Sequence, residues 1–207
     1  MRFLYLILLP SAFYLSAVAQ QPGDLRVTDV RFSQERSPFG GESWLSMEVV
    51  VDVRNNSNES SPNREFVDKI ELQVALANNM GTQSQPMLEY FWTQVEAPTL
   101  KRGSHRFRFY LSPEQIERGR MNNSEPYAWY VQIISGGAAG GSDNSLNPVV
   151  AVSRNLREQP RLDRFLDLLE EQKEERAGIL LPQAETPFRD MFAEETPTIK
   201  GSDRAKE

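Results

Sequence analysis

Apolar and polar residues alternate with a period of two along most of the chain between residues 20 and 157. In the clearest case, Trp44 to Arg54, apolar side chains occupy every second position: Leu45, Met47, Val49, Val51 and Val53. Such alternation is typical of a half-buried antiparallel strand, with one apolar and one polar face. The pattern predicts seven short strands, at 25–32, 44–54, 70–76, 88–95, 105–111, 127–133 and 149–152.

Polar or glycine-rich turns join these strands, among them 55–63, 78–81 and 136–142, and Pro98 is expected to end the fourth strand. Because no long helix lies between the strands, a doubly wound parallel sheet is excluded. The pattern favours an all-β fold, an immunoglobulin-like two-sheet sandwich of about seven strands spanning residues 20–157. We expect one core to contain the alternating apolar residues Phe107, Phe109, Trp129 and Val131.

A short crossover helix is predicted between the fifth and sixth strands. Ser112 stands at the capping position, Pro113 at the first helical position and Gln115 at the third. Gly119 then ends a helix of barely two turns.

The pattern changes after Asn155. In residues 158–178, Leu162, Phe165, Leu166 and Leu169 form one apolar stripe with helical spacing, which predicts an amphipathic helix that docks on its own sheet or on a partner. Residues 179–207 contain three prolines and no sustained periodicity. Acidic charge is concentrated at this end, since residues 158–207 carry 13 acids and 8 bases. We expect 179–207 to be an acidic, flexible tail, or else a segment packed on its own sandwich.

The N-terminus has the anatomy of a cleavable secretory signal over residues 1–19. Arg2 precedes an apolar run, and Ala17-Val18-Ala19 supplies small residues before the expected cleavage site. The alternative is an uncleaved membrane anchor, although Pro10 and Ser11 interrupt a run that would need about 20 apolar residues to cross a bilayer. The signal predicts export to the periplasm or cell surface of a bacterium, with membrane contact only through the uncleaved signal.

Composition argues against several classes of chemistry. The chain has no cysteine and a single histidine, His105, so a tetrahedral zinc site or a histidine-based catalytic triad is not expected. The net charge of −6 gives no reason to expect nucleic acid as a partner. The paired carboxylates lie on faces expected to be solvated, and the glycines of 136–142 lack the lysine of a phosphate loop. We therefore predict a protein that is not an enzyme and uses no cofactor and no metal.

Two features favour a protein partner. Arg106 and Arg108 alternate beside Tyr110, forming a basic and aromatic strip suited to an acidic partner segment. In the tail, Phe188, Met191 and Phe192 are apolar anchors within an acidic stretch that orders on a partner. These six residues are the candidate partner-binding residues.

Four sequence stretches resemble a group of exported bacterial proteins that are encoded alongside type IV pilus components. The stretches are Ser43 to Val49, Phe66 to Ile70, Arg108 to Pro113 and Tyr127 to Val131, and the resemblance covers residues of about 25 to 155. It implies an immunoglobulin-like sandwich that serves as a periplasmic or surface accessory of a pilus or secretion assembly, with no cofactor.

The expected function is thus that of an exported, non-catalytic protein-binding or structural accessory of a pilus-like or envelope assembly. The alternative is a carbohydrate-binding sandwich with exposed aromatic residues, for which Tyr90 with Trp92, or Tyr110 with Tyr130, are the candidates. A hydrolase would require carboxylates clustered in a cleft. The sequence leaves open the partner and the oligomeric state.

Overall fold

The structure is a computed structural model that describes residues 24–54, 56, 63–82, 85, 87–121, 125–135, 149–176, 178–192 and 195–201. The predicted signal, residues 1–19, and the glycine-rich turn at 136–142 lie outside the described residues.

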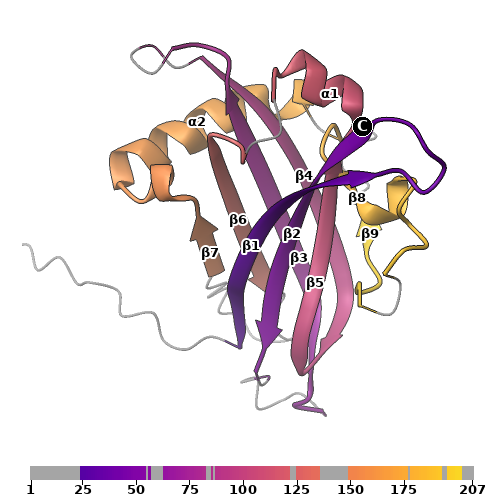
Figure 1. The fold of residues 1–207 in the computed structure, drawn as a ribbon. Helices are drawn as coiled ribbons and strands as arrows, with labels where there is room; N and C mark the ends of the chain where they lie inside the picture. Colours follow the sequence, from indigo (N-terminus) through magenta and orange to yellow (C-terminus); the bar gives the residue numbers. More distant parts are fainter. Residues whose placement is uncertain are drawn as a thin grey trace, which may run out of the picture.

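Two antiparallel sheets pack face to face as an all-β sandwich (Figure 1). Sheet A has the order β1-β2-β5-β8, and sheet B has the order β7-β6-β3-β4-β9. Seven strands build the sandwich: β1 (Leu25–Arg36), β2 (Ser43–Val53), β3 (Phe66–Asn79), β4 (Leu88–Lys101), β5 (Gly103–Leu111), β6 (Ala128–Ser135) and β7 (Val149–Val152). Two further strands of two residues each, β8 (Leu181–Pro182) and β9 (Lys200–Gly201), come from the C-terminal segment.

The seven main strands form an immunoglobulin-like sandwich in which the fourth strand lies in the opposite sheet from that of the constant-type arrangement. The first, second and fifth strands share one sheet, while the third, fourth, sixth and seventh share the other. The β1–β2 and β3–β4 hairpins turn at one end of the sandwich, which we call the upper pole because it is uppermost in Figure 1. β4 passes into β5 at the opposite end. The predicted fold class is confirmed.

The core lies between the sheets and contains the inward-facing residues of both. Phe107, Phe109 and Val131 are at most 1% exposed, and Trp129 packs against the same cluster. The predicted common core is therefore present. Alternation placed it correctly because each of these strands presents one face to the opposite sheet.

The fourth strand does not end before Pro98. β4 continues to Lys101 in unbroken register with β3: Asp68 pairs with Thr99 and Ile70 with Ala97, so Lys69 stands opposite Pro98. Lys69 has a φ of 52°, so the backbone of β3 is distorted opposite the proline without a shift of register. No bridge pair joins Lys69 to Pro98, so the ladder needs no N–H from the proline at this position, and the pairs on either side keep the strand in place.

The crossover helix α1 (Pro113–Arg118) lies at the upper pole, with Pro113 in its first turn and Gly119 directly after its end, as predicted. The hydroxyl of Ser112, however, makes no capping hydrogen bond. The backbone carbonyl of Ser112 accepts the N–H of Ile116 at 3.0 Å instead.

Helix α2 (Gln159–Arg176) follows a single 3₁₀ turn, η1 (Arg154–Leu156), and covers the outer face of sheet B (Figure 1). All four residues of the predicted stripe belong to its contact with that sheet. Phe165 is 2% exposed, and its ring lies against Tyr90 and Tyr130 with centroids 5.1 and 6.4 Å apart. The helix therefore docks on its own sheet.

The interpretation of 179–207 as a flexible tail is wrong for its described part, residues 179–192 and 195–201, which we call the clasp. Leu180 and Phe188 have no exposed surface. β8 pairs with the end of β5, the short 3₁₀ turn η2 (Gln183–Glu185) follows it, and β9 pairs with β4. The clasp thus crosses from the edge of one sheet to the edge of the other, and it obtains its apolar environment from the sandwich.

Candidate functional site: the clasp on sheet A

The outer face of sheet A carries a charged network under the clasp. The register of β2 with β5 pairs Glu48 with Arg108, whose Nη2 atom lies 2.8 Å from Glu48 Oε2 and 3.1 Å from Glu195 Oε2. Arg106 contacts the same two carboxylates, at 3.8 Å from Glu48 and 2.9 Å from Glu195. Two guanidinium groups from β5 are therefore balanced by one carboxylate of the sheet and one of the clasp.

Burial differs sharply within this network. The side chain of Arg108 is 6% exposed, whereas those of Arg106 and Glu195 are 46% and 48% exposed. The hydrogen bonds from Arg108 and then Arg106 lower the pKa of the Glu195 carboxyl. Because a carboxylate held by two guanidinium groups is favoured in its charged form, Glu195 is ionised at neutral pH.

An aromatic cluster adjoins the charges. The ring of Phe188 stacks on that of Tyr110 and meets the ring of Trp44 edge-on, with centroids 4.5 and 5.8 Å apart. Phe192 lies over the guanidinium of Arg108 at 4.2 Å from the ring centroid. Burial, and after it the neighbouring Glu35 carboxylate, raise the pKa of the Tyr110 hydroxyl, so this hydroxyl stays protonated.

The side chain of Gln183 holds the turn of the clasp together by hydrogen bonds. Its buried side-chain amide donates to the carbonyl oxygens of Phe188, at 3.0 Å, and of Met191. Its Oε1 atom accepts the hydroxyl of Thr196 at 2.9 Å, and that hydroxyl oxygen accepts Arg108 Nη1 at 3.1 Å. A continuous chain of hydrogen bonds therefore joins sheet, turn and clasp.

The structure thus brings all six candidate partner-binding residues together. Arg106, Arg108 and Tyr110 line the sheet, and Phe188, Met191 and Phe192 lie in the clasp that covers it. The carboxylate that meets the basic strip is Glu195 of the same chain, and an acidic partner segment stays a prediction. Phe188 and Tyr110 are fully buried, so neither is a free anchor for another molecule.

Sequence reasoning missed Glu48, Gln183 and Glu195. Alternation along β2 places Glu48 on the polar face of the strand, but only the pairing of β2 with β5 puts it beside Arg108. Neither of the other two belongs to a periodic pattern, and Glu195 meets a residue 87 positions earlier.

The aromatic pairs proposed for glycan binding do not form platforms. Tyr90 and Tyr110 are fully buried, Tyr130 is 6% exposed, and Trp92 packs beneath α2. Burial raises the pKa of the Tyr90 hydroxyl to about 12. Tyr110 and Tyr130 also belong to different sheets. A glycan site would have to use other residues.

His105, the single histidine, lies next to Arg106 on β5, and one of its ring nitrogens, Nε2, is 2.6 Å from the carbonyl oxygen of Lys101. In the part of the chain that the structure describes, no three His, Asp or Glu side chains are grouped so as to hold a metal ion. Among the described helices, none is both long and apolar enough to cross a membrane.

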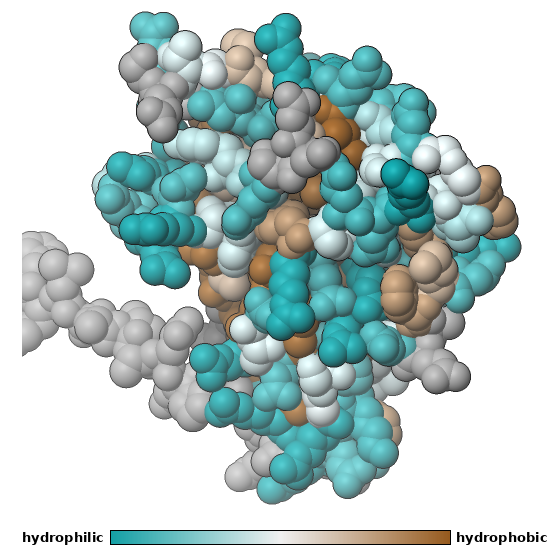
Figure 2. All heavy atoms as spheres, in the orientation of Figure 1, coloured by the Kyte–Doolittle hydropathy of each residue, from teal (hydrophilic) through white to brown (hydrophobic). Residues whose placement is uncertain are grey.

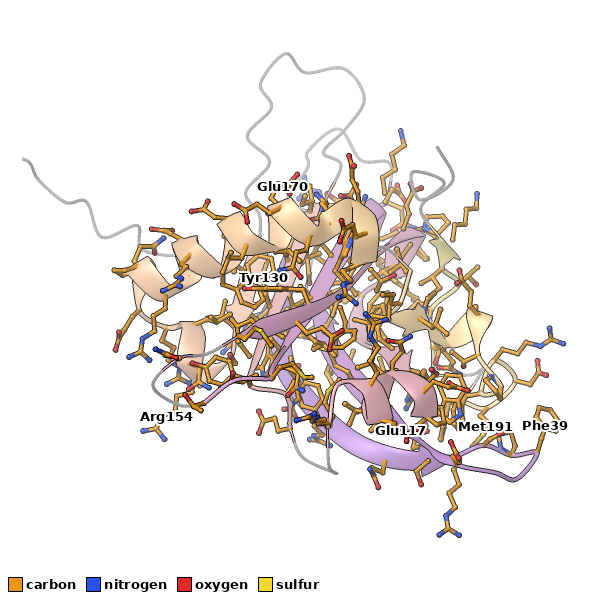
Figure 3. The ribbon with its side chains drawn as sticks, turned by 90° about the horizontal axis from the view of Figure 1, so that it is seen from above. Phe39, Glu117, Tyr130, Arg154, Glu170 and Met191 are labelled. Carbon is orange, nitrogen blue, oxygen red and sulfur yellow. The ribbon has the colours of Figure 1, made fainter. Side chains whose placement is uncertain are left out.

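Four large apolar side chains of the described residues are exposed. Phe39 is 85% exposed, Met87 63%, Phe192 40% and Tyr127 37%. Phe39 and Met87 occupy the β1–β2 and β3–β4 turns, and Tyr127 directly precedes β6, so these three lie at the upper pole. In Figure 2 some hydrophobic residues lie at the right-hand edge of a mostly hydrophilic face, over the β1–β2 hairpin and the clasp, and others lie through the middle of that face. Figure 3, which looks down on the upper pole, shows Phe39 beside Met191 of the clasp.

Both upper hairpin turns are held by hydrogen bonds. The N–H groups of Phe39 and Gly40 donate to the side chain and carbonyl of Ser37, at 3.3 and 3.0 Å. Met80 N–H donates to the carbonyl of Met87 at 2.8 Å, and Met87 N–H donates to Asn79 Oδ1 at 3.2 Å. The exposed side chains therefore project from ordered backbone.

No family model matches the chain, and no curated protein matches its sequence. A solved structure from Akkermansia muciniphila is similar in fold, with a TM-score of 0.59 over 85% of this chain and 93% of that one. Sequence identity between the two is 15%. The likeness supports the all-β sandwich.

Proposed function

We propose that the chain is an exported, non-catalytic accessory of a pilus-like or envelope assembly and that it binds a protein partner with its upper pole. The observation that carries the proposal is the placement of Phe39 and Met87, 85% and 63% exposed, on the two hairpin turns of that pole. Loops at the ends of a sandwich are its usual binding elements, since a rigid scaffold positions them.

The chemistry of these side chains supports a protein partner. Aromatic residues and methionine are enriched in the buried centres of protein interfaces, which polar residues surround. Charged side chains of both signs surround the pole, including the exposed residues Glu117, Arg120 and Arg154. Export and an assembly role rest on the secretory signal and on the resemblance to proteins encoded with pilus components.

The test compares capture of partners from the native envelope by the wild type and by the double variant Phe39→Ser/Met87→Ser. A matched control, Lys101→Ser/Arg102→Ser, changes two exposed residues at the opposite pole. We expect the pole variant to lose at least tenfold of a captured protein that both wild type and control retain, with unchanged melting temperatures. Equal capture by all three chains would contradict binding at the upper pole.

A further inference from the structure

The last seven described residues of the clasp, 195–201, form an arm that is attached less firmly than the rest. Leu180 and Phe188, earlier in the clasp, have no exposed surface. The arm is held by the ion pairs of Glu195, by the hydroxyl of Thr196, by the half-buried Ile199 and by a two-residue ladder in which Gly201 faces Val95 and Lys200 faces Glu96. None of the fully buried core residues belongs to the arm, so its departure removes only the Ile199 contact from the core between the sheets.

The backbone just before the arm is strained. Phe192 has a φ of 58°, in the left-handed region that non-glycine residues adopt at a cost. The N–H groups of Glu195 and Thr196 both donate to its carbonyl oxygen, at 2.9 and 3.1 Å. Holding the arm against its own sheet thus requires an unfavourable backbone conformation, and release of the arm relieves it.

When the arm departs, it uncovers Arg106 and Arg108 on sheet A and the edge of β4. We call this surface the seat. Arg106 and Arg108 are then balanced by Glu48 alone, leaving one unpaired positive charge. At Val95 and Glu96, β4 remains paired with β3 on one side. On its other side it loses β9, the only strand described on that edge. Unpaired strand edges readily accept another strand. The seat therefore fits a peptide in which a carboxylate is followed, five residues later, by two extended residues that pair with β4.

We infer that the seat also accepts the arm of a second copy of this chain, so that two copies exchange residues 195–201 reciprocally. The second copy provides the required carboxylate and strand at the required spacing, and the contacts of the arm with β4, β5 and Gln183 are re-formed between the copies. Three chain steps separate Phe192, which stays on its own Arg108, from Glu195 and span at most about 11 Å, so exchange requires two copies whose A sheets pack closely through this face. Reciprocal exchange closes as a two-fold dimer, a recognised low-cost route to association. The inference does not depend on the proposed function.

The absence of cysteine from the sequence permits a direct test with single-cysteine variants of the full chain. Glu96 and Lys200 are exposed and face each other across the β4–β9 ladder. Facing residues of antiparallel strands have Cα atoms about 4.5–5.5 Å apart, within the range that a disulfide spans. Glu96→Cys and Lys200→Cys chains are mixed in equal amounts at high concentration, diluted and oxidised.

Exchange predicts that the mixture gives at least fivefold more disulfide-linked heterodimer than Thr99→Cys mixed with Lys200→Cys. Thr99 is also exposed on β4 but lies three residues from the register position, so it reports random collision. Equal heterodimer in both mixtures would overturn the inference and leave the arm bound only within its own chain. The double variant Glu96→Cys/Lys200→Cys should form an internal disulfide at low concentration, and failure to do so would overturn the β4–β9 register and the inference with it.

Discussion

The ring of Phe188 lies flat on the ring of Tyr110, with centroids 4.5 Å apart and ring planes 8° apart. One ring comes from the C-terminal segment and the other from the outer face of sheet A. The contact makes the clasp a component of the folded domain, because both side chains lose their entire exposure to solvent.

Phe188→Ala is expected to lower the free energy of unfolding by about 3–5 kcal/mol, the usual cost of removing a buried phenylalanine side chain. Phe192→Ala is the matched control in the same segment. Phe192 is 40% exposed and contributes chiefly its contact with Arg108, so its loss should cost about 0.5–1 kcal/mol. Denaturant titration of both variants measures the difference. Similar small effects for the two would mean that the segment does not stabilise the sandwich.

Glu89 of β4 contacts both α1 and α2. Its substitution should therefore lower the free energy of unfolding more than substitution of a surface carboxylate. Its side chain is 10% exposed and lies 3.0 Å from Arg176 of α2 and 3.4 Å from Arg118 of α1. We expect Glu89→Gln to reduce the free energy of unfolding by about 1.5–3 kcal/mol, as for loss of a hydrogen-bonded charge.

The control for this prediction is Glu170→Gln on the outer side of α2. Glu170 is 74% exposed and lies 3.2 Å from Lys173 one helical turn away. An exposed pair of this kind contributes less than about 1 kcal/mol. Equal losses for the two variants would contradict a bridging role for Glu89.

Acid should weaken the attachment of the arm through Glu195. Because hydrogen bonds from Arg108 and Arg106 lower the pKa of this carboxyl in the folded chain, its stabilising effect is complete above the ordinary glutamate pKa, about 4.3, and is lost as the pH falls through the lowered value. Amide hydrogen exchange of residues 195–201 should therefore be slower in the wild type than in Glu195→Gln at neutral pH. The two chains should converge in acid.

Two controls isolate this effect. Glu48 also faces Arg106 and Arg108 and is present in both chains, so its contribution is common to the two and cancels in the comparison. Glu185→Gln changes an exposed carboxylate elsewhere in the clasp and should leave exchange of the arm unchanged at every pH. A constant difference between the wild type and Glu195→Gln down to strongly acidic pH would show that charge is not the cause.

Local patterns predicted the sandwich and the helix, but contacts distant in sequence decided the clasp. Alternation along β2 and β5 fixes which residues face the core, and the stripe of α2 fixes its buried side. Neither fixes the register that sets Glu48 beside Arg108. Residues 183–192 have no period, so their burial follows from a surface that other strands create. The strand beyond Pro98 was missed for a related reason, since the distorted backbone that faces the proline belongs to Lys69 in the neighbouring strand.

The attachment of α2 to sheet B depends chiefly on Phe165. This side chain is 2% exposed against Tyr90 and Tyr130, whereas Leu168, on the same helix, is only partly buried. We expect Phe165→Ala to cost about 3–5 kcal/mol and Leu168→Ala clearly less, because the cavity left behind grows with burial. The indole N–H of Trp92 donates to the carbonyl of Lys173 at 2.7 Å, so Trp92 reports on the helix. Loosening of α2 should therefore change tryptophan fluorescence in Phe165→Ala before the sandwich unfolds, and a single shared transition would show that helix and sandwich unfold together.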